Sequence, residues 1–380
     1  MQTELINQGQ KVDDAWLTKM LNQCVGKLRK ALPKFQNAFP SACTTNMKYR
    51  IKGNDDWTNG FWTAMMWQAY QITNDSEFKV QAEEQLVSFK QRLADNFILN
   101  HHDIGFLYSL SAYAGYQITG STTDQAMVVA AADVLVGRFQ KKGQFIQAWG
   151  DLDNPDEYRL IIDSLLNLPL LFEAAKISGD SRYATIGQQH YQQVLDYIVR
   201  PDFSTYHTFY FDPQTGQPLK GATRQGYSDN SCWARGQAWI LLGMPLYRRF
   251  FQETNQRERY QELLNYYLQH LPADGVPYWD LIFTEEDQQP RDSSAAAIAA
   301  CGMIEAQKQG YLANGQELAR GIIYRLGESY LTGADQEGLL QHGVYAYADN
   351  KGVDEANLWG DYFFMEALMR LKYHDWQTYW

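Results

Sequence analysis

The stretches IIDSLLNLPLLFEAA (161–175) and SSAAAIAACGMIEA (293–306) are apolar on nearly every side when they are read as helices. By contrast, FKVQAEEQLVSFKQRLADNF (78–97) and QRERYQELLNYYLQH (256–270) each carry one polar face. A helix that is apolar all round must be buried all round, whereas an amphipathic helix covers a core from outside. The alternation of the two kinds therefore predicts an all-α fold with an inner and an outer layer of helices.

Turn signals at Asn74-Asp75, Gly120-Ser121, Gly179-Asp180 and Gly333-Ala334 separate about twelve predicted helices that alternate between the two kinds. We expect outer helices near 11–32, 76–97, 122–140, 181–199, 256–271 and 315–332, and inner helices near 57–73, 106–119, 160–178, 233–252, 291–309 and 358–372. Six pairs, each of one inner and one outer helix, predict a single-domain (α/α)6 barrel over residues 1–380. An open α-solenoid is the alternative, which the unequal repeat spacing disfavours. An insertion near 200–231 contains FYFDPQTGQPL (209–219), which predicts a β-hairpin.

The composition excludes several classes of function. The net charge is −11 and Lys and Arg form no cluster, so we expect no nucleic-acid partner. Charged residues make up 20% of the chain, and no apolar stretch reaches the roughly 18 residues of a membrane span, so we expect a soluble protein without a membrane partner. Aromatic residues make up 14%, which favours the stacking of sugar rings as well as a large core. An acidic sugar stays possible, since a few well-placed donors hold a carboxylate whatever the global charge.

The compartment is predicted from the first residues and from the cysteines. The start, MQTELINQGQKVDDAW, has neither the basic nor the apolar region of a secretory signal. Cys24, Cys43, Cys232 and Cys301 are scattered and form no CxxC pair, which fits reduced thiols that serve packing. We therefore expect a cytoplasmic protein, as a monomer or a weak homodimer.

Polar and aromatic residues gather at the start of nearly every predicted inner helix. The clusters are Asp55–Trp57, His101–Asp103, Glu157–Arg159 leading to Asp163, Asp229–Trp233, Arg291–Ser294 and Glu355–Asp361. In a closed ring the inner helices all point the same way, so these clusters converge on one mouth, where helix N-termini favour an anion. The alternative is that Asp56, Asp103, Asp229 and Asp292 are simple N-caps.

Asp163 fits the N-cap alternative least, because it falls inside a predicted helix among Ile161, Ile162 and Leu165. A carboxyl in such a setting is poorly hydrated, so its pKa should rise, as a general acid requires. The sequence has no HExxH motif, Cys/His cluster or glycine-rich phosphate loop, and His101-His102 lack partners for a metal site. We therefore expect neither a metal nor another cofactor.

Five stretches resemble a known family, and together they run essentially from end to end. They are DDWTNGFW (55–62), NHHDIGF (100–106), IIDSLLNLPLL (161–171), ATRQGYSDNSCWARGQAW (222–239) and GVDEANLWGDYFFMEAL (352–368). They are similar to the unsaturated glucuronyl hydrolases, glycoside hydrolase family 88. The resemblance implies an (α/α)6 barrel without metal or cofactor.

The resemblance also implies roles for individual residues. It places the family's catalytic acid/base on Asp163 and its second essential aspartate on Asp103, with His102 directly before it. The positions that line the family's pocket are Trp57, Trp149, His207, Gln225, Trp233, Arg235 and Trp239. Trp side chains can stack on a sugar, Arg235 and Gln225 can donate to a uronate, and Asp103 can accept from vicinal hydroxyls.

The implied substrate is an oligosaccharide, a disaccharide above all, whose non-reducing end is a 4,5-unsaturated uronic acid left by a polysaccharide lyase. This sugar is an enol ether, so the chemistry can be hydration of its C4=C5 bond. Asp163 would protonate C4. A water deprotonated by the same carboxylate would add at C5, and the resulting hemiketal would open and release the partner sugar.

Three alternatives stay open at this point. An unsaturated rhamnogalacturonyl hydrolase would share the barrel and the chemistry but act on another partner sugar. An ordinary glycosidase or a sugar epimerase could use the same barrel, because a fold alone does not fix chemistry. A non-catalytic sugar-binding protein would keep the tryptophans but has no use for Asp163 in an apolar setting.

One stretch departs from the streptococcal members of the family, which carry Ser-x-x-Ser-x-Lys before the last inner helix, associated with a sulfate on the partner sugar. The matching stretch here is AYADNK (346–351), with Ala346, Asp349 and Lys351 in those places. Two hydroxyl donors are lost and a negative charge is gained, which Lys351 partly offsets if it pairs with Asp349. We therefore expect a preference for unsulfated hyaluronan or chondroitin disaccharides.

Overall fold

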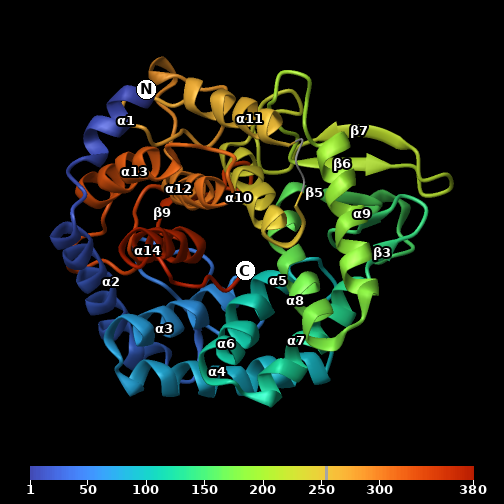
Figure 1. Cartoon of the computed structure of the whole chain (residues 1–380), viewed down its shortest axis with the longest axis horizontal. Helices are drawn as coiled ribbons and strands as arrows, with labels where there is room; N and C mark the ends of the chain where they lie inside the picture. Colours follow the sequence, from blue (N-terminus) through green and yellow to red (C-terminus); the bar gives the residue numbers. More distant parts are fainter. Residues whose placement is uncertain (253–255) are drawn as a thin grey trace.

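The computed structural model of the chain describes residues 1–252 and 256–380. Most of these residues are helical, and the helices lie in two layers around a common centre (Figure 1). The inner layer consists of α3 (Asn59–Thr73), α5 (Ile104–Tyr108) with the π-helix η1 (Ser109–Tyr113) and α6 (Ala114–Thr119), α8 (Leu168–Ser178), α10 (Ala234–Phe250), α12 (Ser293–Lys308) and α14 (Leu358–Lys372). The outer layer consists of α2 (Asp14–Phe35), α4 (Ser76–Ala94), α7 (Thr122–Val136), α9 (Ser181–Tyr197), α11 (Arg257–Gln269) and α13 (Gly315–Ser329), with α1 (Gln2–Gly9) packed on α13.

The inner helices form a closed ring. Each contacts the next in chain order, and α14 contacts α3, which joins the last inner helix to the first. Helix α12 is buried from Ser293 to Ala306, whereas the outer helix α4 buries only one face. The arrangement fits the barrel that the two kinds of helix predict.

The predicted turns between inner and outer helices are confirmed at Asn74-Asp75, Gly120-Ser121 and Gly179-Asp180. The first residue of each pair ends an inner helix in the left-handed conformation, which Asn and Gly adopt readily. The second residue then accepts a hydrogen bond from the backbone N–H near the start of the next helix. These dipeptides therefore reverse the chain in a few residues.

The strands are short and lie in the connections at the ends of the barrel. Strands β5 (Arg159–Ile161), β6 (Thr208–Phe211) and β7 (Pro218–Ala222) form an antiparallel sheet, and β6 and β7 form the predicted hairpin. Strands β8 (Gly343–Ala346) and β9 (Lys351–Glu355) form a second hairpin that was not predicted. The remaining strands and 3₁₀-helices are β1 (Phe39–Pro40), β2 (Ile51–Lys52), β3 (Phe139–Gln140), β4 (Phe145–Ile146), η2 (Pro155–Glu157), η3 (Ile162–Leu166) and η4 (Glu285–Asp287).

The prediction of one continuous inner helix over 160–178 is wrong. Residues 159–161 pair with β6, the 3₁₀-helix η3 follows, and α8 begins only at Leu168. Pro169 explains the late start, because proline has no N–H to donate and is tolerated in the first turn of a helix but not in its interior. Asp163 therefore lies in a tight turn before the helix rather than within it.

The centre of the ring is filled by aromatic side chains. The ring of Phe106 lies 5.4 Å from Trp57, 5.5 Å from Trp239 and 6.0 Å from Trp380, measured between centroids. The four cysteines are all buried as free thiols, in keeping with a packing role. Among the described residues, no helix combines the length and the apolar character needed to cross a membrane.

Candidate active site

A pocket of about 430 Å³ opens at the end of the barrel where the inner helices begin. Most residues predicted for the site line it: Trp57, Asp103, Trp149, Asp163, Gln225, Trp233, Arg235, Trp239, Asp349 and Lys351. His102 and His207 do not line the pocket, and both are buried behind it. The sequence therefore predicted which segments meet here, although they are spread over almost 300 residues.

The predicted convergence of all polar clusters on this pocket is wrong for the last two inner helices, because no residue of Arg291–Ser294 or Glu355–Asp361 lines it. Asp361 lines a separate cavity of about 410 Å³ beside α2, where it accepts hydrogen bonds from Tyr49 Oη and two backbone N–H groups. Asp292 is buried, caps α12 and pairs with Arg235, so it supports the pocket from behind. A polar residue near a helix start thus reaches the pocket only when the turn that carries it directs its side chain into the pocket.

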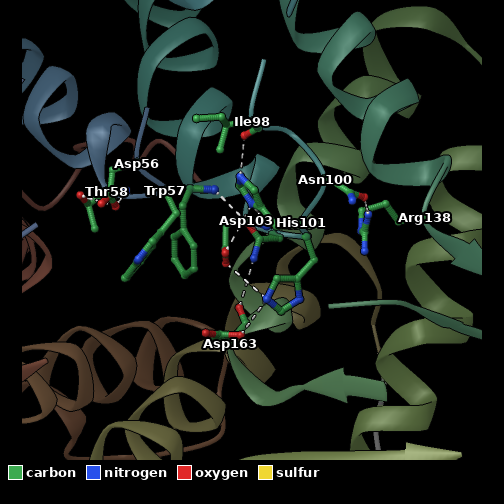
Figure 2. A network of polar contacts seen from close by, with 12 residues as sticks. Asp56, Trp57, Thr58, Ile98, Asn100, His101, Asp103, Arg138 and Asp163 are labelled. Atoms are coloured by element: carbon green, nitrogen blue, oxygen red, sulfur yellow. Dashed lines mark hydrogen bonds and ion pairs between the residues drawn. The ribbon is translucent and has the colours of Figure 1, made fainter. Parts of the chain in front are cut away.

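Two carboxylates, Asp103 and Asp163, lie opposite each other at the base of the pocket (Figure 2). The buried His102 ring joins them, since its Nε2 is 3.2 Å from Asp163 Oδ1 and 3.3 Å from Asp103 Oδ1. His101 Nδ1 lies 3.5 Å from Asp103 Oδ2 on the other side. The Asp163 side chain is 19% exposed and that of Asp103 13%, so both reach the pocket while remaining largely shielded from water.

The N-cap alternative fails for Asp103. Asp103 precedes α5, but its side chain accepts no capping hydrogen bond, unlike Asp75 or Asp180 in the outer layer. Its carboxylate is turned to the two histidines instead. A charged group that caps nothing and faces a pocket is available to a ligand.

The segments that carry the two carboxylates are held together by a close backbone approach. A side chain at Gly105 would have its Cβ 2.4 Å from Asn167 Cα, so only glycine allows the start of α5 to approach the end of η3. Asn167 Oδ1 also accepts a hydrogen bond from Phe106 N at 2.9 Å. The turns that carry Asp103 and Asp163 are therefore fixed relative to each other.

His190, from the outer helix α9, fixes the turn of Asp163 from behind. Its Nδ1 accepts a hydrogen bond from Ile146 N at 2.9 Å, so its Nε2 must carry the proton in the neutral ring. Nε2 then donates to Ser164 Oγ at 2.6 Å, and Ser164 Oγ donates to Ile161 O. Burial lowers the pKa of His190 to about 3, which keeps the ring neutral. A defined chain of hydrogen bonds thus links β4, α9 and η3.

The environment moves the pKa values of the two carboxylates in opposite directions. Burial raises the pKa of Asp163, and the neighbouring His102 offsets this only in part. Burial acts in the same direction on Asp103, but His102 and His101 outweigh it and hold the pKa of Asp103 below its usual value. For His102, burial lowers the pKa, but the charges of Asp103 and Asp163 raise it above the usual value. The raised pKa suits Asp163 to proton transfer, and the lowered pKa keeps Asp103 ionised.

Arg235 and Gln225, the two predicted uronate donors, differ in how many of their N–H groups are already used in hydrogen bonds within the protein. Arg235 is buried, pairs with Asp292 at 2.7 Å, and donates to the backbone oxygens of Val344 and Tyr345. It also donates to Gln225 Oε1 at 2.9 Å. Because arginine can only donate, the amide oxygen of Gln225 must face it, which leaves Gln225 Nε2 as a donor for a ligand. Arg235 contributes mainly its charge and the orientation of Gln225.

The side walls are aromatic and supported from behind. Trp233 carries the Arg235 guanidinium over its ring at 4.4 Å and contacts the His207 ring at 4.7 Å between centroids. His207 Nδ1 accepts a hydrogen bond from Arg224 N at 2.8 Å, so this histidine shapes the loop that carries Gln225. Elsewhere in the lining, the Arg159 guanidinium lies over the Trp149 ring at 4.7 Å.

The mouth of the pocket carries the most exposed charges. Arg224 and Asp349 form an ion pair with 3.5 Å between Nη2 and Oδ2, and their side chains are 58% and 51% exposed. Lys351 lies over the ring of Tyr345, with Nζ 3.9 Å from its centroid. The cation that pairs with Asp349 is therefore Arg224 and not Lys351, because β9 directs Lys351 toward Tyr345.

Several residues at the pocket were not assigned from the sequence, namely Glu157, Arg159, Arg224 and Tyr345. Glu157 and Arg159 belong to a polar cluster that was noted, and they form an ion pair of 2.7 Å with each other. Arg224 directly precedes Gln225, and Tyr345 directly precedes Ala346. Their position next to assigned residues indicated that they could line the pocket. The conformations of the loops that carry Arg224 and Tyr345 could not be predicted from the sequence.

The expectation that the histidine pair lacks metal-ligating partners needs correction. Ligand atoms of His102, Asp103 and Asp163 lie within 4.8 Å of one another, a spacing in which a cation could be held. The sequence did not reveal this group because Asp163 is 61 residues from His102 and is brought next to it only by the fold. The same group includes the contacts of His102 Nε2 with Asp163 Oδ1 at 3.2 Å and with Asp103 Oδ1 at 3.3 Å.

Comparison with known proteins gives consistent relatives. The model of Glycosyl Hydrolase Family 88 matches residues 31–320. The unsaturated chondroitin disaccharide hydrolase of Streptococcus pneumoniae is 44% identical over 369 residues, which cover 95% of this chain and 92% of the relative. The crystal structure of an unsaturated glucuronyl hydrolase from Streptococcus agalactiae superposes with a TM-score of 0.93 at 42% identity, covering 97% of this chain and 94% of the other.

A variant of the S. agalactiae enzyme, solved in complex with dGlcA-GalNAc6S, superposes with a TM-score of 0.86 at 38% identity and covers 99% of this chain and 97% of that chain. The family match, the long alignments and the superpositions agree with the residue pattern of the pocket. This chain belongs to glycosyl hydrolase family 88.

Proposed function

We propose that this protein is an unsaturated glucuronyl hydrolase that acts on lyase-generated hyaluronan or chondroitin disaccharides, hydrating the C4=C5 bond of the unsaturated uronate. The observation that carries the proposal is the Asp163 carboxyl, with its raised pKa, opposite a charged Asp103 in a pocket walled by tryptophans. The relatives that carry the name of this activity support it. The pocket, about 430 Å³, is of the size that holds small ligands.

The proposed reaction uses one carboxyl twice. Protonated Asp163 gives its proton to C4, and the positive charge develops on C5 and the ring oxygen. The Asp163 carboxylate then takes a proton from a water that adds its oxygen to C5. The hemiketal opens, the bond between C1 and the partner sugar breaks, and the uronate is released as an open-chain keto sugar.

The surrounding residues bind and orient the uronate. Asp103 stays charged and accepts hydrogen bonds from sugar hydroxyls, while Gln225 Nε2 donates to the carboxylate near the positive charge of Arg235. Trp57, Trp149, Trp233 and Trp239 surround the sugar ring.

We further propose the domain organisation, oligomeric state and compartment in which the enzyme works. The chain acts as one (α/α)6-barrel domain over residues 1–380, as a monomer or weak homodimer, without nucleic-acid or membrane partners. The four buried free thiols support the reducing cytoplasm as its compartment. No metal or other cofactor takes part, so dialysis against a chelator should leave the rate unchanged.

Loss of the enoate's ultraviolet absorbance tests the proposed function. The protein is incubated with the unsaturated disaccharide of hyaluronan or chondroitin, and the absorbance is expected to decay to zero with release of the partner sugar. A lyase-generated rhamnogalacturonan disaccharide serves as the comparison substrate. No decay with the glucuronyl substrates would contradict the assignment.

The pH profile is expected to report the interaction between His102 and Asp163. The positive charge of His102 stabilises ionised Asp163 and so lowers its pKa. In His102→Gln this charge is lost, the pKa of Asp163 rises, and Asp163 keeps its proton to higher pH. The basic limb of kcat/KM should therefore move to higher pH, along with a lower maximal rate. A limb that stays in place, or that moves to lower pH, would count against Asp163 as the acid.

The hydrogen-bond chain through His190 predicts a loss in kcat rather than in binding. In His190→Ala the turn of Asp163 loses its support, so kcat should fall by about tenfold or more while KM changes little. His190→Gln can still donate to Ser164 and should keep more of the rate. His270→Ala, which alters a histidine bonded within its own outer helix, is the control. Steady-state kinetics on the folded variants decide the point, and equal rates for His190→Ala and the wild type would refute it.

The residues at the mouth of the pocket predict a preference for unsulfated substrates. Ala346 and Asp349 offer no hydroxyl donor, and Asp349 occupies Arg224 in an ion pair, which leaves that cation less available to a sulfate. We expect kcat/KM on the unsulfated disaccharide to exceed that on the 6-sulfated form by about tenfold or more, which corresponds to ~1.4 kcal/mol. The combined variant Ala346→Ser, Asp349→Ser should move the ratio toward the sulfated substrate. Equal or faster turnover of the 6-sulfated form by the wild type would contradict this prediction.

A further inference from the structure

Four aromatic side chains form a continuous row that connects the two loops at the mouth of the pocket. The row, hereafter the aromatic row, consists of Tyr227, Phe283, Trp279 and Tyr347. Tyr227 contacts Phe283 at 5.1 Å between ring centroids, and Phe283 contacts Trp279 at 5.4 Å. Tyr347 stacks on Trp279 at 4.4 Å with 13° between the ring planes. The four rings therefore join three separate loops.

The two ends of the aromatic row are open to solvent, while its centre is fixed. Tyr227 is 60% exposed and Tyr347 is 38% exposed. Trp279 is buried, and its Nε1 donates to Gln289 Oε1 at 3.0 Å. The backbone N–H of Tyr227 donates to Asp280 Oδ2 at 2.9 Å, which ties its loop to that of Trp279. Exposed rings held in place by a buried one lose little entropy when they bind a ligand.

The aromatic row begins where the lining of the pocket ends. Tyr227 follows Arg224 and Gln225 by two or three residues, and Tyr347 lies between Ala346 and Asp349. These four neighbours all line the pocket, and the ion pair between Arg224 and Asp349 bridges the same two loops. A chain of sugars whose reacting end lies at the shielded Asp163 can leave the pocket past the exposed Arg224 and Asp349, which lie next to the aromatic row in the sequence.

We propose that the aromatic row is a subsite for the third sugar of a longer unsaturated oligosaccharide, so that the enzyme favours tetrasaccharides over disaccharides. This inference rests on the proposed function. Stacking of an apolar sugar face on the exposed rings, next to the Arg224–Asp349 ion pair, suits the mixed character of a pyranose. Binding energy from such a remote sugar can be used at the reacting bond.

The experiment compares unsaturated hyaluronan tetrasaccharide and disaccharide by loss of enoate absorbance. For the wild type, kcat/KM on the tetrasaccharide should exceed that on the disaccharide by about 3- to 10-fold. Tyr347→Ala and Tyr227→Ala should each bring this ratio close to one, while Tyr347→Phe should preserve it because the ring remains. Tyr373→Ala is the control, since Tyr373 has the same exposure of 38% but follows the C-terminal end of α14.

The outcomes separate the failure of the subsite from the failure of the function. If the wild type consumes neither substrate, the proposed function itself is wrong. If it consumes both at equal rates, or if the ratio is the same in wild type and in the two Ala variants, the subsite is refuted. If Tyr227→Ala changes the sedimentation of the protein from dimer to monomer and leaves the ratio unchanged, the aromatic row binds a second copy of this chain and the proposal is overturned.

Discussion

Replacement of Asp163 by Asn is expected to lower kcat by at least roughly 10³-fold while the substrate still binds, because the amide keeps the shape of the carboxyl but cannot donate and recover a proton. Asp163 is the group whose pKa burial raises, and it lies in the turn that His190 and Asn167 hold against α5. Single-turnover kinetics on the unsaturated disaccharide measure the rate, and calorimetric titration with the same sugar measures the dissociation constant.

Asp361 provides a matched control for this substitution. It is also a buried aspartate, and burial raises its pKa to about 6, but it lines the separate cavity beside α2. Asp361→Asn is therefore expected to lower the thermal stability and to leave the turnover of the folded protein within about twofold. If Asp163→Asn keeps a rate similar to that of Asp361→Asn, the assignment of the acid is wrong.

The second large effect is expected at Asp103, where Asn should lower kcat/KM by roughly 30- to 100-fold. The substitution removes a charged acceptor for sugar hydroxyls and the anion that holds His102 and His101 in place. Asn and Asp are equally good N-caps, so a residue that only capped a helix would tolerate the change. Asp180→Asn provides that comparison, since Asp180 does cap α9.

Steady-state kinetics on both variants, with melting temperatures, separate the two roles. Asp103→Asn should melt close to the wild type and lose activity, whereas Asp180→Asn should change neither property strongly. A fully active Asp103→Asn would return this residue to the status of a structural group near a helix start.

The sequence was most informative where the physical signal is local. A helix such as 293–306 is apolar on every side and has only one possible environment, so its place in the inner layer followed directly. The dipeptides Asn74-Asp75, Gly120-Ser121 and Gly179-Asp180 contain both the end of one helix and the cap of the next. Such features need no knowledge of the rest of the chain.

The errors arose where the decisive contact is distant in sequence. Asp163 seemed helical because its neighbours are apolar, but pairing with β6, almost 50 residues later, and the late helix start at Pro169 determine its turn. The sequence indicated that Arg235 can donate to a uronate, but it did not show that this side chain also donates to Asp292, Val344 and Tyr345. No local pattern indicates partners that lie 57 to 110 residues away.

The site shows the same division between local and distant information. The polar clusters at the starts of inner helices and the apolar setting of Asp163 pointed to the two aspartates, and the family resemblance implied the pocket tryptophans. The supporting role of His190 was not foreseen, because a histidine in an outer helix has no sequence signal that points to the pocket. The ion pair between Arg224 and Asp349 depends on two loops that are brought together only by the closed barrel.

The most direct test of the account is the position of the isotopes after turnover in labelled water. The unsaturated disaccharide is turned over in deuterium oxide and, separately, in water enriched in heavy oxygen, and the uronate product is analysed by NMR and mass spectrometry during the first turnovers, before its carbonyl groups exchange with the solvent. If Asp163 protonates the double bond, deuterium is found at C4 and heavy oxygen at C5. Heavy oxygen at C1, with no deuterium at C4, would show ordinary glycoside hydrolysis and contradict the proposed mechanism.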